Sequence, residues 1–227
     1  MIVLSPRSFL KYPILSPILS PILRLFFHLL YHKFAWMYDL VAGTVSLGLW
    51  KEWVLAVLPY IRSNQVLEIG HGPGHLQIAL QQKGLVAFGL DISLEMGRLA
   101  ERNIVRCGMV FRLVNGYAQC LPFSNNSFET VVATFPTEFI MDINTLQDIQ
   151  RVLVPGGELL VLPVAWITGK RWFEKAAAGL FQITGQAPEW EERALEPARQ
   201  AGFLTEVEKH KVKSSQVLIV HAVKPRL

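Results

Sequence analysis

From Gln65 onward, short apolar runs rich in β-branched residues alternate with longer segments whose apolar positions recur at helical spacing. Runs of the first kind predict strands, and segments of the second kind predict helices. The expected strands are residues 65–70, 85–90, 110–114, 130–135, 157–162, 204–211 and 216–223. The expected helices are residues 75–83, 94–106, 143–153 and 190–201. Such alternation favours a parallel sheet covered by helices on both faces.

The last two expected strands are separated by only the few residues from Val212 to Ser215. A parallel crossover needs about a dozen residues or more, so these two strands must pair as an antiparallel hairpin. The pattern therefore predicts a Rossmann-like, doubly wound α/β sheet of seven strands, mostly parallel and completed by a C-terminal antiparallel hairpin. Ligands on such sheets bind beyond the carboxyl ends of the strands.

The beginning of the chain has a different pattern. Residues 13–24 place a proline at every fourth position, which disfavours a continuous helix because each proline removes a backbone donor. Ser20 and Pro21 suit a helix start, so we expect a helix from Pro21 to about Ala42 that ends at Gly43. A second amphipathic helix is expected from about Trp50 to Ile61.

These elements divide the chain into two parts. Residues 1–61 form a basic, aromatic, helical extension that serves as an arm or lid, and residues 62–227 form the α/β domain. Residues 163–189 interrupt the strand–helix alternation and contain several aromatic side chains, which favours either a wall of a substrate pocket or a cover for the sheet edge.

The net charge of +4 arises entirely in residues 1–38, which hold four basic and no acidic side chains. The rest of the chain balances, so nothing in it favours nucleic acid as a partner. We expect residues 1–42 either to contact a membrane surface peripherally or to pack on the domain. A membrane span ranks third, because Arg24, His28 and Asp39 would be costly inside a bilayer.

Cys107 and Cys120 are the only cysteines. They have neither metal-ligand spacing nor a C-x-x-C pattern, so we expect reduced structural thiols, no metal, and a cytoplasmic protein that can lie peripherally at a membrane.

The stretch from Glu68 to Gly74 reads E-x-G-x-G-x-G and joins an expected strand to an expected helix. Glycine lets a ligand lie directly against the main chain, and the free N–H groups of the helix start suit a polar or anionic group. The dinucleotide fingerprint would place a glycine where this chain has His75. Asp91 ends the next strand, where an acid can accept both hydroxyls of a ribose.

Five segments in this order resemble the class I S-adenosylmethionine-dependent methyltransferases, in particular the small-molecule type that includes quinone-biosynthesis enzymes. The resemblance covers about residues 38–223 and is poorest over 163–189. The segments are Val66–Gly74, Gly89–Ser93, Leu121–Phe123 with Ser127–Glu129, Arg151–Gly157 and Ala201–Phe203.

The resemblance implies that S-adenosylmethionine is the cofactor and S-adenosylhomocysteine the product. It implies that Gly70, Gly72 and Gly74 line the methionine end of the cofactor, and that Glu68 organises the loop or reaches the amino group. It further implies that Asp91 holds the ribose. Ile92 would then lie against the adenine.

The same resemblance points to residues after the third and fourth strands. Where the family usually has Gly-Asp-Ala before Gln119, this chain has Gly-Tyr-Ala, and Tyr117 cannot replace the aspartate as an acceptor. Either the adenine contact moves to the backbone at Ala118, or the affinity for the cofactor is lower. Thr134, Phe135 and Pro136 follow the fourth strand, and the resemblance implies that this segment meets the sulfonium and the substrate. Tyr38 corresponds to a tyrosine that closes over the cofactor, although a packed aromatic residue is nearly as good an interpretation.

Methyl transfer from a sulfonium needs alignment more than acid–base chemistry, so the pattern assigns no catalytic residue. We interpret His71 and His75 as loop and helix-start residues, and Glu138 and Asp142 as solvated acids. The leading hypothesis is methyl transfer to a small, apolar acceptor such as a lipid or quinone. The alternatives are a non-catalytic cofactor-binding regulator or partner subunit and, third, a nicotinamide oxidoreductase. The acceptor and the oligomeric state stay open.

Overall fold

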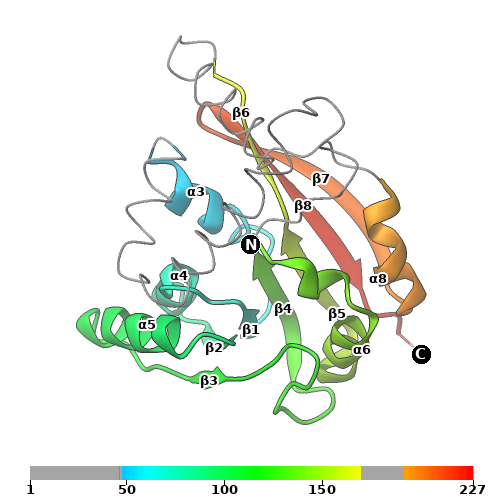
Figure 1. The fold of residues 1–227 in the computed structure, drawn as a ribbon, viewed down its shortest axis with the longest axis horizontal. Coiled ribbons are helices and arrows are strands. Elements are labelled where there is room, and N and C mark those ends of the chain that lie inside the picture. Colours follow the sequence, from blue (N-terminus) through cyan, green and yellow to red (C-terminus); the bar gives the residue numbers. More distant parts are fainter. Residues whose placement is uncertain (1–45, 47, 170–191, 227) are drawn as a thin grey trace, which may run out of the picture.

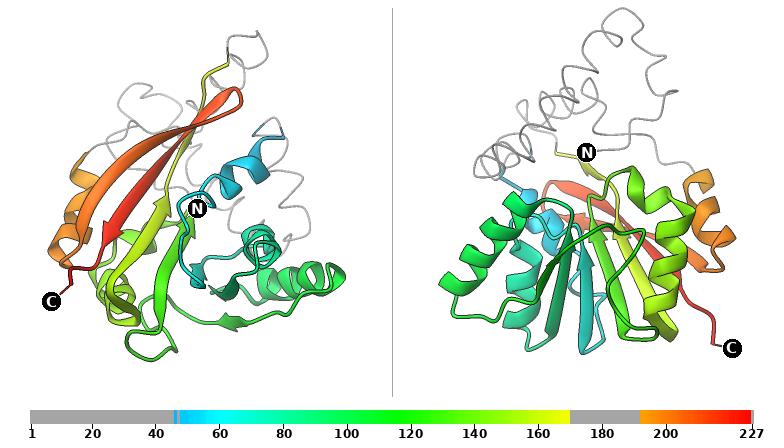
Figure 2. Two further views of the ribbon diagram at one scale, coloured as in Figure 1. Left: turned by 180° about the vertical axis from the view of Figure 1, so that it is seen from behind. Right: turned by 60° about the horizontal axis from the view of Figure 1, so that its bottom comes forward.

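The computed structural model describes residues 46, 48–169 and 192–226, which form one mixed sheet with helices on both faces (Figures 1 and 2). The strands are β1 (Gln65–Ile69), β2 (Val86–Asp91), β3 (Leu113–Asn115), β4 (Phe128–Thr134), β5 (Leu153–Leu162), β6 (Ala165–Ile167), β7 (Leu204–Val212) and β8 (Ser215–Val223). The helices are α3 (Trp50–Leu55), α4 (His75–Gln82), α5 (Leu94–Arg106), α6 (Ile143–Val152) and α8 (Glu196–Gln200), with 3-10 turns η3 (Glu138–Met141) and η4 (Glu192–Leu195).

The sheet has a parallel part and an antiparallel part. Strands β3, β2, β1, β4 and β5 lie side by side in this order and are parallel. Strand β8 pairs antiparallel with β5 on one side and with β7 on the other. The β7–β8 hairpin turns through Lys213, which has a φ of 49°. The predicted Rossmann-like sheet with an antiparallel C-terminal hairpin is therefore confirmed.

The sheet contains eight strands in the described part of the chain, where seven were predicted. The extra strand, β6, lies in the segment that was expected to interrupt the alternation. It pairs with the first half of β8, and Leu218 N donates to Val164 O at 3.1 Å, so β6 continues the line of β5 along β8. The apolar residues after Pro163 extend the sheet because β8 is longer than the part of it that β5 covers.

Several predicted boundaries were wrong. The helix expected from Trp50 to Ile61 ends at Leu55 and continues as turns, because Pro59 lacks an N–H group and disfavours the helical conformation of the residue before it. The helix expected over residues 190–201 is reduced, in its described part, to η4 and the five-residue α8. Strand β3 begins three residues late, and β5 begins four residues early because Leu153 already pairs with Phe128.

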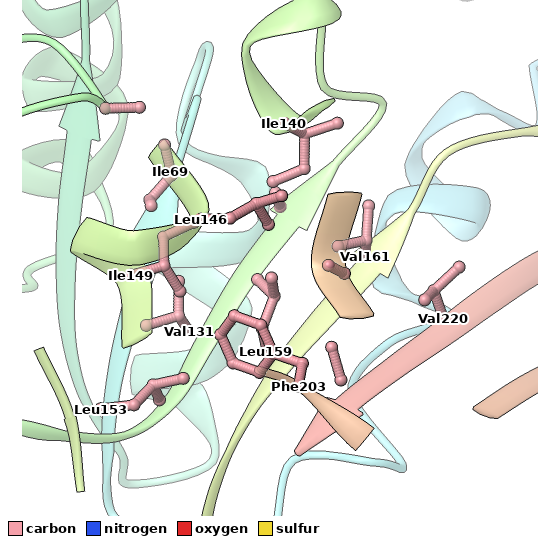
Figure 3. Close-up of a cluster of buried hydrophobic side chains, with 14 of the residues drawn as sticks. Ile69, Val131, Ile140, Leu146, Ile149, Leu153, Leu159, Val161, Phe203 and Val220 are labelled. Carbon is pink, nitrogen blue, oxygen red and sulfur yellow. The ribbon is translucent and has the colours of Figure 1, made fainter. Parts of the chain in front are cut away.

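The core has two halves, one on each face of the sheet. Val66 faces a cluster that includes side chains from α3 and α4, whereas Leu67 and Ile69 face a cluster built from α6, α8 and the strands (Figure 3). The strict alternation along β1 divides its side chains between these clusters. The sheet is therefore buried on both faces, as its continuous apolar strands require.

The predicted N-terminal arm is only partly described. Tyr38 and the helix expected over residues 21–42 lie outside the described residues, as do residues 170–189 of the predicted insertion. Trp53, Val57 and Ile61 are buried in the same cluster as Val66, so α3 and the turns after it share the core of the domain. The division at residue 61 stays a prediction.

Across the described ranges, no helix has the length and apolar character needed to cross a membrane. The same ranges hold no group of three or more His, Cys, Asp or Glu side chains that could bind a metal ion. Cys107 and Cys120 are exposed free thiols.

Candidate functional site

Three glycines shape the turn that leads from β1 into α4. The φ angles are 76° at Gly70, 50° at Gly72 and 85° at Gly74, a region that side-chain-bearing residues rarely adopt. Gly70 N donates to Leu90 O at 2.7 Å, and Gly74 N donates to His71 O at 3.0 Å. The turn thus presents bare main chain at the carboxyl end of β1, as the glycine spacing predicted.

Gly74 also lets two helices approach each other. A Cβ atom on Gly74 would lie 3.1 Å from Ala100 Cβ and 3.3 Å from Ala100 Cα, in the middle of α5. This contact fixes the start of α4 against α5. Two requirements, a positive φ and close packing, therefore select glycine at this position.

The carboxylate of Asp91 binds the glycine turn from the end of β2. Its Oδ2 accepts a hydrogen bond from Gly72 N at 3.0 Å, and its Oδ1 accepts one from Ser93 N at 2.9 Å. The residue is only 2% exposed. Asp91 thereby joins the carboxyl ends of β1 and β2.

Glu68 lies in β1, two residues before Gly70, on the face of the strand that packs against α4. Its Oε2 accepts a hydrogen bond from Gln77 Nε2 at 2.8 Å, and the residue is 1% exposed. Burial, reinforced by the charge of Asp91, raises the pKa of Glu68 to about 8, although the hydrogen bond from Gln77 acts in the opposite direction. The side chain therefore carries a proton at neutral pH and ties β1 to α4.

Gln77 and Gly89 also pack around Glu68 and His71, and the sequence analysis assigned neither of them a role. Gln77 Nε2 also donates to Phe88 O at 3.0 Å, so it bridges β1 and β2. A Cβ atom on Gly89 would lie 2.6 Å from Leu113 Cδ2 and 3.0 Å from His71 Cδ2. The only sequence signal for the pairing of Gln77 with Glu68 was the position of Gln77 in the first turn of the helix that follows the glycine turn.

The two histidines of the turn differ in their surroundings. His71 is buried, its Nδ1 lies 2.8 Å from Gly72 O, and burial lowers its pKa. It packs beside Gly89, which fits its interpretation as a loop residue. His75 is the first residue of α4.

The carboxyl end of β3 lies beside Asp91 and carries the segment that departs from the family pattern. Asn115 Nδ2 donates to the carbonyl oxygens of Asp91 and Ile92, at 3.0 and 2.9 Å. Ala118 is buried, whereas Gln119 is exposed. Tyr117 and Ile92 expose 65% and 50% of their surface.

Aromatic side chains follow the carboxyl end of β4 on both faces of the sheet, Phe139 on the face of α6 and Phe135 on the face of α3. Glu68 pairs with Val132 in register, which brings Gly70 opposite Thr134, and Phe139 Cζ lies 3.9 Å from the Cβ position of Gly70. Phe135, directly after Thr134, has a φ of 47° and stacks on Trp50 of α3 with ring centroids 4.5 Å apart. Phe135 belongs to the segment that the sequence analysis placed near the sulfonium and the substrate, whereas Trp50 and Phe139 were not among the predicted site residues.

The acids after β4 have modest roles in the structure. Glu138 is exposed in η3. Asp142 caps α6, because its Oδ1 accepts a hydrogen bond from Asn144 N at 3.1 Å. Neither Glu138 nor Asp142 forms an ion pair within the described part of the chain, and nothing there identifies either as a base.

A cavity of about 430 Å³ lies at the opposite, amino-terminal edge of the parallel strands. Thr130 near the start of β4 and Glu158 in the middle of β5 line it, together with Tyr60 and His221. It is separated from the glycine turn by the length of the strands and is not part of this site.

The strand order, the glycine turn after β1 and the acid at the end of β2 define a Rossmann-like fold that binds a nucleoside-bearing cofactor. Residues 66–157 match the sequence profile of a family described as methyltransferase domain. This match covers the glycine turn, Asp91, Tyr117 and the strands up to the start of β5.

Related sequences and structures agree with this match. The chain is 36% identical over 136 residues to the ubiquinone/menaquinone biosynthesis C-methyltransferase UbiE of Legionella pneumophila strain Paris, covering 55% of this chain and 54% of that protein. It is 32% identical over 148 residues to UbiE of Blochmanniella floridana, covering 61% and 58%. The chain thus spans only slightly more than half the length of these relatives.

Solved structures share the fold at lower identity. A methyltransferase of Methanosarcina mazei superposes with a TM-score of 0.54 at 21% identity, covering 75% of this chain and 97% of that one. A phosphoethanolamine N-methyltransferase of Haemonchus contortus, in complex with S-adenosylhomocysteine, superposes with a TM-score of 0.58 at 21% identity, covering 78% and 53%. The 4+2 cyclase SpnF superposes with a TM-score of 0.58 at 18% identity, covering 77% of this chain and 80% of that one. The same fold therefore also serves other chemistry.

The resemblance to class I S-adenosylmethionine-dependent methyltransferases is thus confirmed, with residues 66–157 matching a methyltransferase domain. The cofactor of this family is S-adenosylmethionine, and the residues of the site fit it. The main chain of Gly70, Gly72 and Gly74 has no side chain to hold a ligand away, the Asp91 carboxylate lies at the end of β2 against this turn, and Ile92 offers an exposed apolar side chain beside it.

Proposed function

We propose that this protein transfers a methyl group from S-adenosylmethionine to a small, apolar acceptor such as a lipid or a quinone. The observation that carries the proposal is the glycine turn hydrogen-bonded to the carboxylate of Asp91, at the carboxyl edge of the sheet. The relatives named as quinone-biosynthesis C-methyltransferases support the class of acceptor.

The residues of the turn would hold the cofactor in a fixed order along the sheet edge. The main chain from Gly70 to Gly74 would bind the methionine end, and the carboxylate of Asp91 at the end of β2 would accept from the ribose hydroxyls. Ile92 would contact the base. The cofactor supplies an activated methyl group with an excellent leaving group.

The aromatic group after β4 supports an apolar acceptor. Phe139 lies beside Gly70, where the methyl group would face the acceptor, and Phe135 follows Thr134 and stacks on Trp50 on the face of the sheet that carries α3. These rings exclude water and can hold an apolar molecule in line with the methyl group, and alignment supplies most of the rate enhancement for such a displacement. No charged side chain of the described residues is required for this step.

Calorimetric titration with S-adenosylhomocysteine tests the donor site. We expect the wild type to bind and Asp91→Ala to bind at least roughly tenfold more weakly, because two N–H groups lose their acceptor along with the ribose hydroxyls. Glu95→Ala, which removes an exposed acid from the first turn of α5, is the matched control and should bind like the wild type. No binding by the wild type, or undiminished binding by Asp91→Ala, contradicts the proposal.

Transfer of labelled methyl groups into a lipid extract separates the enzyme from a non-catalytic, cofactor-binding regulator or partner. We expect label from S-adenosylmethionine to enter the extract with the wild type. Trp50→Ala and Phe135→Ala should reduce this transfer roughly tenfold or more while the affinity for S-adenosylhomocysteine stays within about twofold. Normal cofactor binding without any transfer would favour the regulator.

We further propose that the protein acts in the cytoplasm and that residues 1–42 contact a membrane surface. All of the excess positive charge lies in residues 1–38, beside a high content of Leu, Ile and Phe. Such a segment binds anionic lipid by charge and by burial of apolar side chains. An apolar acceptor in the membrane would make this location useful.

A further inference from the structure

Tyr117 is an exposed aromatic residue on a rigid part of the candidate site. It exposes 65% of its surface, which only Leu204 equals among the large apolar side chains that the structure describes. It follows β3 directly and lies beyond Asp91 and Ile92 in the direction from β1 to β3. A tyrosine ring left uncovered at a ligand site is available for a ligand to bury.

The backbone around Tyr117 is fixed by hydrogen bonds to the end of β2. Gly116 N donates to Asp91 O at 3.1 Å, and Asn115 Nδ2 donates to Ile92 O at 2.9 Å. On its other side, Cys120 N donates to Tyr117 O at 3.2 Å. The side chain therefore projects from a turn that is tied to the residue proposed to hold the ribose.

The chemistry of this turn differs from that of a carboxylate site. Residues 115–120 contain no acid, and Asp148, near the end of this stretch, already accepts hydrogen bonds from Leu121 N and Arg151. A carboxylate would accept from an amino group and repel a carbonyl oxygen at the edge of a base. The phenol of Tyr117 can donate as well as accept, and its ring offers a flat surface.

We propose that Tyr117 recognises the base of the cofactor by ring contact and by a hydroxyl that both donates and accepts, so that this protein does not discriminate adenine from hypoxanthine. The inference rests on the proposed function, since it assigns a residue to the base end of the same cofactor. Ile92 forms the second apolar contact of the base. Binding energy at this end thus comes from contact area rather than from an acceptor specific for an amino group.

The test compares the affinities of S-adenosylhomocysteine and S-inosylhomocysteine, which differ only in the amino or carbonyl group at position 6 and in the associated ring proton. We expect the wild type to bind both within about threefold. Tyr117→Asp should favour the adenine compound by roughly tenfold or more, because the carboxylate accepts from the amino group and repels the carbonyl oxygen. Tyr117→Ala should weaken both compounds roughly tenfold, through loss of ring contact.

Two control variants make the result specific. Tyr117→Phe keeps the ring and should retain most of the affinity without a preference. Phe111→Ala removes an exposed aromatic side chain before the amino end of β3, far from Asp91, and should leave both affinities unchanged. Far-ultraviolet circular dichroism checks that each variant is folded.

The outcomes separate this inference from the proposed function. If the wild type binds neither compound, the methyltransferase proposal itself fails. If it binds S-adenosylhomocysteine at least tenfold more tightly than the inosine compound, or if Tyr117→Ala binds both compounds as the wild type does, the donor site stands and the assignment of Tyr117 is wrong.

Discussion

Single residues in the glycine turn act through backbone conformation more than through side-chain chemistry. Gly74 needs a φ of 85° and also has no room for a methyl group beside Ala100. Gly97, three positions before Ala100 in the same helix, has open space around its Cβ position and lies in α5. The two positions therefore make a matched pair.

We expect Gly74→Ala to lower the free energy of unfolding by about 2–4 kcal/mol, since it adds left-handed strain and a steric overlap. Gly97→Ala should raise it by about 0.5–1 kcal/mol, because alanine favours the helix. Urea denaturation followed by circular dichroism measures both. Equal effects of the two substitutions would contradict this account of the turn.

The buried Glu68 makes stability depend on pH. Its pKa rises from 4.5 to about 8 on folding, so between these values the folded state holds a proton that the unfolded state has lost. The free energy of unfolding should therefore fall as pH rises from 4.5 to 8, by at most about 1.4 kcal/mol per pH unit from this group, and the contribution is constant outside this window.

Glu68→Gln should remove this dependence while keeping an acceptor for Gln77. The difference in the free energy of unfolding between Glu68→Gln and the wild type should grow in favour of the variant from pH 5 to pH 8. Urea titrations at pH 5, 6, 7 and 8 measure it. A difference that stays constant with pH would show that Glu68 does not hold a proton in the folded state.

At the scale of elements, a buried hydrogen bond joins α3 to the C-terminal hairpin. Trp53 is 0% exposed, and its Nε1 donates to Ser215 Oγ at 2.6 Å. Ser215 Oγ in turn donates to Val212 O at 2.6 Å. This chain of bonds connects residues 162 positions apart and fixes the element that carries Trp50.

We expect Ser215→Ala to cost about 1–3 kcal/mol of stability, because it leaves the buried indole N–H without this acceptor. In a Trp53→Phe background the same change should cost less than about 1 kcal/mol, because the donor is already gone. Ser124→Ala, at an exposed serine, is the control. Equal costs of Ser215→Ala in both backgrounds would show that the two side chains are not coupled.

Two of the segments that match the family, Leu121–Phe123 and Arg151–Gly157, are joined into one structural unit. Arg151 donates to Asp148 and to the carbonyl oxygens of Leu121 and Phe123, which holds the loop before β4 against α6. Burial alone would raise the pKa of Asp148, but the hydrogen bonds from Arg151 and Leu121 N and the positive charge of Arg151 together lower it. The hydrogen bonds of Arg151 therefore give these segments a structural role.

At the scale of the whole molecule, the excess of positive over negative charge lies entirely in residues 1–38. We expect the full chain to float with vesicles that contain anionic lipid and to dissociate at high salt, since each basic residue contributes about 1 kcal/mol near such a surface. A variant lacking residues 1–20 should float less. Arg7→Glu/Lys11→Glu, which reverses the charge in that segment without shortening the chain, should have a similar effect.

Neutral vesicles are the control for this measurement. Equal, negligible flotation of the full chain and the shortened variant would remove the proposal of membrane contact. Equal binding to neutral and anionic vesicles would show that the basic side chains are not responsible.

The sequence alone determined the features that depend on neighbouring residues. The strand–glycine–helix unit from Val66 to Gly74 and the position of Asp91 follow from local periodicity and from conformations that only glycine adopts readily. The C-terminal hairpin follows from the short connection after Val212, which cannot reach a parallel position. The cofactor followed from the resemblance of five segments, which include this turn and Asp91, to class I S-adenosylmethionine-dependent methyltransferases.

The tertiary structure decided what depends on residues far apart in the chain. The insertion of β8 between β5 and β7, the addition of β6, the burial of Glu68 against Gln77 and the stacking of Trp50 on Phe135 all join distant segments. Such contacts form only when packing selects one arrangement, because no local pattern records which side chain a residue will meet. The sequence thus determined the methyl-donor turn, whereas the structure determined its surroundings and the aromatic group proposed to face the acceptor.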